Sequence, residues 1–229
     1  MEYSGVICIT QQKIVELFRK EKTTMGNRAV ITTKESWAHG GIGVYLHWNG
    51  GRDSVEAFLK YCDLKGYRSP SEDCYGWARL CQVVGNFFGG NTSIGLDTLW
   101  HLDCDNYDNG VYIIDGWQIV DRHYFRGEEQ NEYDLNEMLT VIDKAMPEDE
   151  RISDFLKAKV TDDVKVGDKI VRIDWNGQIE KAEIEGFGDN DIVNGHDVNG
   201  VPYVNLYGED HAHNINNYLL KNNWRKVVE

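Results

Sequence analysis

The sequence has no long apolar run, few cysteines and only three prolines in 229 residues. No stretch approaches the roughly 18 uninterrupted apolar residues that a membrane-spanning helix needs. The N-terminus lacks the basic start, apolar core and small-residue cleavage site of a signal peptide. These absences argue against a membrane protein and predict that the chain stays in the cytoplasm.

Cysteine is too scarce and too irregular to form a framework. The five thiols are an odd number, and no CxxC pair occurs among them, so neither a disulfide scaffold nor a zinc knuckle is indicated. We expect reduced and mostly buried thiols at Cys8, Cys62, Cys74, Cys81 and Cys104.

Positive charge is also in short supply. Lys and Arg number 24 against 38 Asp and Glu, which gives a formal net charge of −14 and a pI near 4.9. Such a field repels nucleic acid and anionic membranes, and it attracts a basic protein. We therefore expect no direct binding of nucleic acid or membrane. Acidity that only keeps the protein soluble is the simpler alternative.

The motifs of common enzyme classes are absent: there is no Walker loop, no G-x-S-x-G elbow and no HExxH. Cys74 or Cys104 could pair with His101 or His123 as a nucleophile and base, but no local signature supports this pairing. We predict no catalytic residues and no cofactor.

Two groups of residues raise a metal hypothesis. His101, Asp103, Asp105 and Asp108 offer suitable ligands, but a calcium loop starting at Asp103 would have Tyr107 in fifth place and Ile114 in twelfth. Near the C-terminus, zinc would need fixed third and fourth ligands. The candidates there are His196, Glu209, His211 and His213. We predict no metal site in either group.

The stretch GVYLHWNGG at 43–51 could be an active-site motif or a strand that enters a turn. In a strand, Val44, Leu46 and Trp48 would face one side, with Tyr45 and His47 on the other. A similar pattern, VRIDWNG, returns at 171–177, which favours a local structural meaning. We therefore interpret His47 as structural or exposed.

Periodicity along the chain predicts an α+β fold. Strands are expected at 28–37 and 43–48, and a hairpin around Asp115-Gly116. Helices are expected from the capping pair Asp53 and Glu56 to Gly66, over 75–88, and from the pair Asp134 and Glu137 to Pro147. This order favours a largely antiparallel sheet with helices on one face.

Composition divides the chain into three parts. Residues 1–24 contain an apolar helical stripe that EKTTMGNR interrupts, so we expect a helical extension before a main domain at 25–149. A charged stretch at 147–163 marks a boundary. The strand and turn patterns after it, including Asn176-Gly177, predict a small β-barrel-like domain at 160–229.

The stretch 128–143 has six acidic residues and no Lys or Arg, and it follows an acidic run at 103–108. We expect a basic partner to dock on these two segments. The predicted partner-binding residues are Asp103, Asp105, Asp108, Glu128, Glu129, Glu132, Asp134 and Glu137.

Four ungapped blocks carry a resemblance to known proteins: MGNRAVITTKES, GVYLHWNGGRDSVEAFLKYC, YGWARLCQVVGNFFGG and DNGVYIIDGWQIVDR. Over about residues 25–146 the chain resembles an uncharacterised family found in phages and other mobile elements of Gram-positive bacteria. Members of that family begin near the position of Met25, so residues 1–24 depart from the pattern.

The resemblance transfers no catalytic residues, but it implies a context. A small acidic accessory protein of a mobile element is similar to the anti-CRISPR inhibitors that act in the host cytoplasm. It implies a basic host partner such as a CRISPR effector nuclease, whose channel accepts negative charge. The alternatives are a hydrolase acting on a nucleotide signal or a protein through His47, His101 or Cys104, and a structural or regulatory module. The sequence also leaves open whether the chain forms a homo-oligomer.

Overall fold

The chain forms two compact units, Met1–Arg151 and Ile152–Glu229. The computed structural model describes residues 27–90, 93–126, 128–129, 133–159, 161, 163–174, 177–189, 192–193, 196–197, 199–204 and 224–227. The predicted helical extension at 1–24 lies outside the described residues. The division between the units falls within the charged stretch at 147–163.

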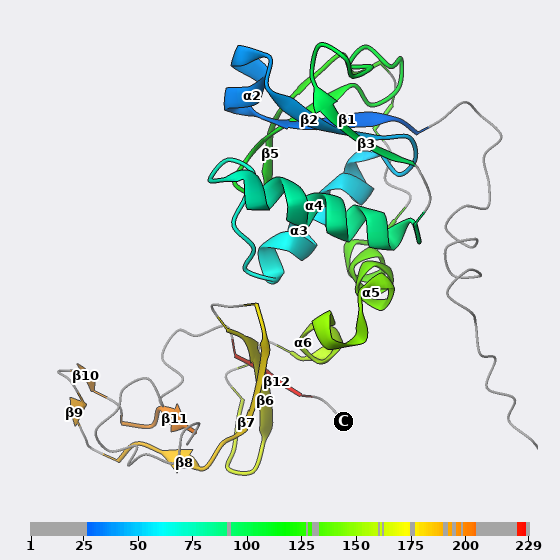
Figure 1. Cartoon of the computed structure of the whole chain (residues 1–229). Coiled ribbons are helices and arrows are strands. Elements are labelled where there is room, and N and C mark those ends of the chain that lie inside the picture. Colours follow the sequence, from blue (N-terminus) through cyan, green and yellow to red (C-terminus); the bar gives the residue numbers. More distant parts are fainter. Residues whose placement is uncertain are drawn as a thin grey trace, which may run out of the picture. The chain divides into compact units, whose positions relative to one another are not determined.

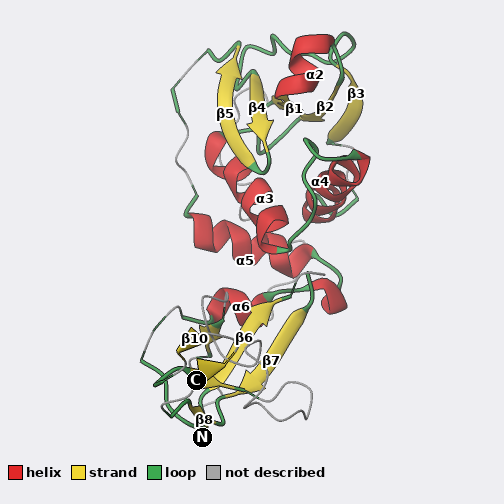
Figure 2. Cartoon of the chain, turned by 90° about the vertical axis from the view of Figure 1, so that its left-hand side faces the viewer, coloured by secondary structure: helices red, strands yellow, loops and turns green. Residues whose placement is uncertain are grey.

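Unit 1 combines a sheet with helices, so the predicted α+β class is confirmed (Figure 1, Figure 2). Its strands are β1 (Ala29–Thr33), β2 (Ile42–Leu46), β3 (Ile94–Thr98), β4 (Val111–Asp115) and β5 (Gln118–His123). Its helices are α2 (Lys34–His39), α3 (Arg52–Leu64), α4 (Cys74–Phe87), α5 (Leu135–Ala145) and the short 3-10 helix η1 (Glu148–Glu150).

The five strands run in the order β3-β2-β1-β4-β5. The sheet is mixed: three of its four strand pairs are antiparallel, in line with the prediction, and one pair is parallel. β1 lies in the centre, antiparallel to β2 and parallel to β4. A parallel pair needs a long crossover, and here the chain from α2 to Gly110 supplies it. β3 was not predicted, because the Gly and Asp in Ile-Gly-Leu-Asp-Thr give it a weak strand signal.

Helices cover both faces of the sheet, which corrects the predicted one-sided arrangement. Figure 1 shows α3, α4 and α5 on the side of the sheet opposite to α2. The predicted strand at 28–37 ends at Thr33, whose hydroxyl accepts a hydrogen bond from the Ser36 backbone N–H and caps α2. On the α2 side, Trp37 packs against a buried cluster of Val30, Val111 and Ile113.

Two of the predicted helix caps have different outcomes. The Asp134 carboxylate accepts hydrogen bonds from the backbone N–H groups of Asn136 and Glu137 at 2.9 and 3.2 Å, which confirms it as the cap of α5. The prediction for α3 was wrong, because Gly51 precedes the helix and Asp53 is its second residue. Asp53 instead accepts from the Tyr133 backbone N–H at 3.0 Å.

One residue of the expected acidic face of 128–143 points into the core. Asp143 is buried on α5 and accepts a hydrogen bond of 2.8 Å from the Tyr61 hydroxyl of α3. A buried carboxylate must be hydrogen-bonded, because leaving it unpaired costs several kcal/mol. Asp143 therefore holds α5 against α3 and is not available to a partner.

In its described residues, unit 2 contains small sheets and the short helix α6 (Ser153–Lys157). Its sheets pair β12 (Arg225–Lys226) with β6 (Lys169–Ile173) and β7 (Ile179–Glu183), β8 (Gly186–Phe187) with β11 (Pro202–Tyr203), and β9 (Ile192–Val193) with β10 (His196–Asp197). Its buried cluster consists of Ile170, Ile184 and Val204. The predicted barrel is not found, since the strands described in this unit do not close.

None of the described helices is long and apolar enough to cross a membrane.

The buried tyrosines predict a loss of stability in alkali. Burial raises the pKa of Tyr61 above its ordinary value of 10, and it raises the pKa of Tyr67 to about 12. The folded chain thus keeps protons that the unfolded chain releases near pH 10. The stability that these groups contribute is complete below pH 10 and falls above it, by up to about 1.4 kcal/mol per pH unit for each group.

We expect urea midpoints to fall between about pH 10 and pH 12. Tyr61→Phe should have a lower midpoint at pH 8 and a shallower fall in alkali, since it removes one titrating group. Tyr75→Phe is the matched control, because Tyr75 is exposed, and it should keep the wild-type curve. Identical pH dependence in wild type and Tyr61→Phe would contradict the assignment.

Candidate protein-interaction site

The connection from β3 to β4, residues 99–110, lies on the α2 side of the sheet. Its apolar residues Leu99, Leu102 and Cys104 pack against the cluster of Val30, Val111 and Ile113. The acidic residues of the connection alternate with these anchors, and Asp103 is exposed between Leu102 and Cys104. Packing of the apolar side chains thus places the predicted acidic run at the surface.

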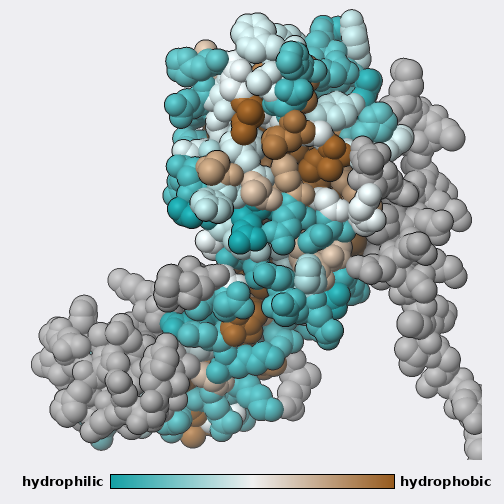
Figure 3. All heavy atoms as spheres, viewed as in Figure 1, coloured by the Kyte–Doolittle hydropathy of each residue, from teal (hydrophilic) through white to brown (hydrophobic). Residues whose placement is uncertain are grey.

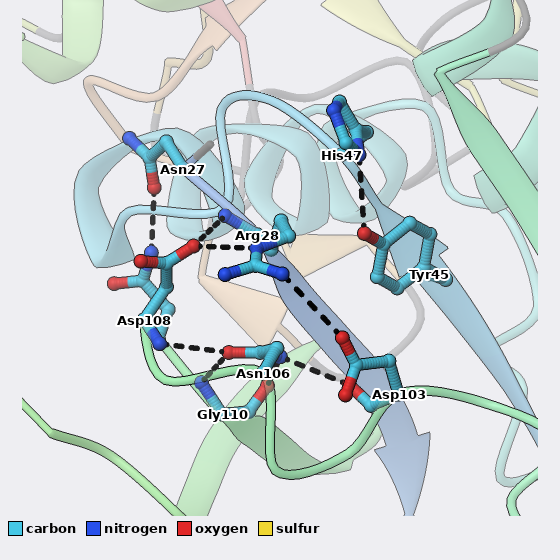
Figure 4. A network of polar contacts seen from close by, with 9 residues as sticks. Asn27, Arg28, Tyr45, His47, Asp103, Asn106, Asp108 and Gly110 are labelled. Carbon is cyan, nitrogen blue, oxygen red and sulfur yellow. Dashed lines mark hydrogen bonds and ion pairs between the residues drawn. The ribbon is translucent and has the colours of Figure 1, made fainter. Parts of the chain in front are cut away.

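Asn106 holds this connection in one conformation and is fully buried. Its side-chain N–H₂ donates to the carbonyls of Asp103 and Gly110, both at 3.2 Å. Its side-chain oxygen accepts from the backbone N–H groups of Asp108 and Gly110 at 3.1 and 3.0 Å (Figure 4). Four hydrogen bonds to one buried amide leave the loop little freedom to change shape.

Arg28, just before β1, lies between two of the predicted partner-binding residues. Its Nε donates to Asp108 Oδ2 at 2.8 Å, and its Nη1 lies 3.5 Å from Asp103 Oδ2 (Figure 4). The hydrogen bond to Asp108 raises the pKa of Arg28 above its ordinary value. The two carboxylates thus face a guanidinium, and no group of metal-ligating side chains occurs in the described part of the chain.

Two more of the predicted acidic residues are paired with arginine. Asp105 Oδ2 accepts from Arg126 Nη2 at 2.9 Å. Both carboxylate oxygens of Glu129 accept from Arg122 Nη1, at 2.9 and 2.8 Å. Arg122 is only 11% exposed, and its guanidinium lies 3.6 Å from the centre of the Phe125 ring. Glu129 is therefore part of the packing of unit 1 as well as of its surface.

The predicted partner-binding residues do not share one face. Asp103, Asp105 and Asp108 lie on the connection over the α2 side, whereas Asp134 and Glu137 lie at the start of α5, in the helical layer across the sheet (Figure 1). Glu128 and Glu129 lie between β5 and α5, and both are exposed. Glu132 lies outside the described residues.

Two exposed tyrosines beside the acidic connection have a strained backbone. Tyr107 has φ of 59° and Tyr124 has φ of 57°, in the left-handed region that bulky residues rarely adopt. Gly110 allows the connection to approach the end of β5 closely, since a Cβ there would collide with the backbone of His123 and Tyr124. Exposed aromatic residues held at a cost of about 1–3 kcal/mol each are typical of binding surfaces.

The histidine and cysteine candidates do not form a catalytic pair. Cys104 Sγ donates to the Leu99 carbonyl at 3.6 Å, and burial raises the pKa of its thiol. His101 Nδ1 lies 3.2 Å from Asp97 Oδ1, and the exposed Cys74 begins α4. No hydrogen bond joins a thiol to a histidine among the residues that the structure describes.

His47 is exposed, as the sequence suggested, but the strand ends one residue before it at Leu46. Its Nδ1 lies 3.1 Å from the Tyr45 hydroxyl (Figure 4). Of the C-terminal zinc candidates, Glu209, His211 and His213 lie outside the described residues, and only the backbone of His196, in β10, is described.

A second exposed apolar area lies on unit 1. Figure 3 shows apolar side chains gathered on one face and ringed by hydrophilic ones. Among the exposed apolar residues is Leu96 on the edge strand β3, which has one hydrogen-bonded neighbour, β2. Its neighbour Asp97 places a charge on this edge, which disfavours pairing with another strand.

Asn106→Ala should destabilise unit 1 by about 2–4 kcal/mol, because it leaves buried backbone groups without partners. The expected result is a lower urea midpoint with an unchanged slope. The matched control Asn136→Ala removes an exposed side chain on α5 and should shift the midpoint little. An Asn106→Ala midpoint equal to that of the control would show that the loop does not depend on this amide.

Comparison with known proteins returns no match to a protein family, a curated protein or a solved structure. The resemblance to mobile-element proteins therefore stays a prediction, and function is inferred from the charges and contacts of this chain.

Proposed function

We propose that this protein is an accessory protein of a mobile genetic element that binds and inhibits a basic, nucleic-acid-handling protein of the host defence. An anti-CRISPR inhibitor of an effector nuclease is the best example of this class. The proposal is supported by the distribution of charge, by the exposed aromatic residues and by the resemblance of residues 25–146 to proteins of mobile elements.

The observation that carries the proposal is that, in the described part of unit 1, few positive charges lack an acidic partner. Unit 1 has eleven Lys and Arg among residues 27–151, and eight of them form ion pairs with carboxylates. The eight are Arg28, Lys34, Arg52, Lys60, Lys65, Arg68, Arg122 and Arg126. The surplus of acidic residues therefore dominates the field that an approaching protein meets.

A channel that holds a nucleic-acid duplex is a natural target for this surface. Such channels carry Lys and Arg placed to meet phosphates, so an acidic protein gains attraction there. Attraction of this kind speeds association and weakens as salt increases. An inhibitor of this type needs no catalytic residues, cofactor or metal.

The hydrolase alternative gains no support from the contacts of His47, His101 and Cys104 described above. For unit 2 we propose the role of a small β domain, barrel-like when complete, that adds a second contact with the same partner. Deletion of 160–229 tests that role, because weaker binding with unit 1 still folded is the expected result.

The structure sharpens the choice of charge reversals. Glu128 and Glu137 are exposed, and neither forms an ion pair within the described part of unit 1. Replacing Glu129 would instead place a lysine against the nearly buried Arg122 and disturb folding. Glu128→Lys combined with Glu137→Lys therefore tests the acidic surface without this complication.

We expect the wild-type protein to inhibit guide-directed DNA cleavage by at least one member of a panel of purified effector nucleases from Gram-positive hosts. The double reversal should weaken inhibition roughly three- to tenfold at about 50 mM salt and less at about 300 mM. The control, Glu148→Lys with Asp149→Lys in η1, makes the same change in net charge.

Loss of inhibition only in the Glu128 and Glu137 variant would support the acidic surface. Equal losses in both variants would assign the effect to net charge alone. No inhibition of any nuclease at an excess of the wild-type protein would contradict the proposed function.

A further inference from the structure

Three exposed aromatic residues and three acidic residues lie around the connection over the α2 side of the sheet. Trp100 is 83% exposed, Tyr107 68% and Tyr124 48%. The acidic residues beside them are Asp103, Asp105 and Asp121. We call these six residues the acidic aromatic surface.

Contacts along α2 link the members of this surface. The Trp100 indole lies against Gly40, where a Cβ would collide with it, and Gly40 caps the C-terminus of α2. Three residues earlier, Trp37 stacks on the His123 ring at 4.7 Å and meets the Tyr124 ring edge-on at 6.0 Å. Figure 2 shows α2 and the adjoining loops at one end of unit 1.

Arg126, two residues after Tyr124, borders the other side of this surface. Its guanidinium lies 4.6 Å from the centre of the Tyr107 ring and donates to Asp105. Its backbone N–H donates to the Asp108 carbonyl at 3.3 Å. The acidic aromatic surface is thus one patch, joined through α2 and the segment 123–126.

We infer that this surface binds arginine side chains of a partner protein. The inference rests on the proposed function, since it names the contact surface and the recognised group of a basic partner. An arginine is selected over a lysine because its planar guanidinium stacks on aromatic rings while it donates to carboxylates.

The chain's own Arg126 already makes this kind of contact. It combines stacking on Tyr107 with a hydrogen bond to Asp105, and Tyr107 nevertheless keeps most of its surface open to solvent. Incoming arginines would repeat this arrangement on the open ring surfaces of Trp100, Tyr107 and Tyr124.

The acidic members retain capacity for an incoming cation. Asp103 faces Arg28 at the long distance of 3.5 Å. Asp121 accepts from the Arg122 backbone N–H at 2.8 Å and lies 3.2 Å from His123, but its side chain is 62% exposed. The Asp105 side chain is 42% exposed, and its Oδ2 already accepts from Arg126. A guanidinium, with five donors, can satisfy several such oxygens at once.

The geometry of the surface is fixed before a partner arrives. Asn106 and Gly110 hold the backbone that places Tyr107 and Tyr124 in their strained conformations. A rigid aromatic side chain loses little conformational entropy on binding. The conformational entropy of these tyrosines is therefore lost when the chain folds and not when it binds a partner.

Titration of the full chain with a short polyarginine peptide, and with a polylysine peptide of the same length, tests the inference by calorimetry. Both peptides should bind an acidic protein, so the measured quantity is the preference between them. We expect arginine to be preferred roughly three- to tenfold in the wild type.

The test variant combines Tyr107→Asn and Tyr124→Asn. Asn tolerates positive φ, so the loops keep their backbone while the rings are lost. The preference for arginine should disappear in this variant and persist in Tyr75→Asn. That control removes an exposed tyrosine on α4 that also lies under an arginine, Arg68, at 5.1 Å.

A preference that is absent in the wild type, or unchanged in the double variant, would overturn the inference even if nuclease inhibition is observed. A dimer that forms without peptide and is lost in the double variant would also overturn it, because the surface would then serve a second copy of the chain. An intact preference without inhibition of any nuclease would instead contradict the proposed function and leave the arginine surface standing.

Discussion

The arrangement of unit 1 depends on the ion pair between Arg28 and Asp108, together with the buried amide of Asn106. Arg28 precedes the central strand β1, and Asp108 lies just before β4, its parallel neighbour. A parallel pair has no tight turn to set its register, so the buried side chains of the two strands and contacts at the strand ends set it. Asn106 shapes the loop that delivers Asp108 to Arg28, and the same loop places the acidic aromatic surface. Pairing, loop shape and surface thus form one cooperative set.

Local features of this fold could be predicted from sequence, because their signals lie within a few residues. The Asp134 cap of α5, the hairpin turn at Gly116 and the helix over 75–88 are examples. Features set by distant residues could not. KESWAH follows a strand-like run, and packing of Trp37 against Val30, Val111 and Ile113 acts together with the Thr33 cap to make it a helix. The parallel pairing of β1 and β4 could not be predicted either, because it depends on the path that the chain takes through α3 and α4 between these strands.

The same limit applies to the candidate site. Sequence shows how many carboxylates a segment has, but it does not show that Arg28 neutralises Asp108 or that Asp143 turns inward to Tyr61. The acidic face therefore has fewer available members than its composition suggests. The sequence gives little indication of the strained tyrosines. For Tyr107 it is the presence of an aromatic residue inside the turn-forming run Asn-Tyr-Asp-Asn-Gly. Their positive φ occurs where that run approaches the end of β5 closely at Gly110.

The central position of β1 also determines how much of the chain must be synthesised before unit 1 can fold. Val30 pairs with Val111, so the open edge of the β1 and β2 pair has no neighbour until β4 has been synthesised. Contacts between such distant positions form slowly, and an unpaired strand edge is prone to wrong pairing in the meantime. The topology of unit 1 thus builds a delay into its folding. Residues 27–126 must all leave the exit tunnel before its surface exists.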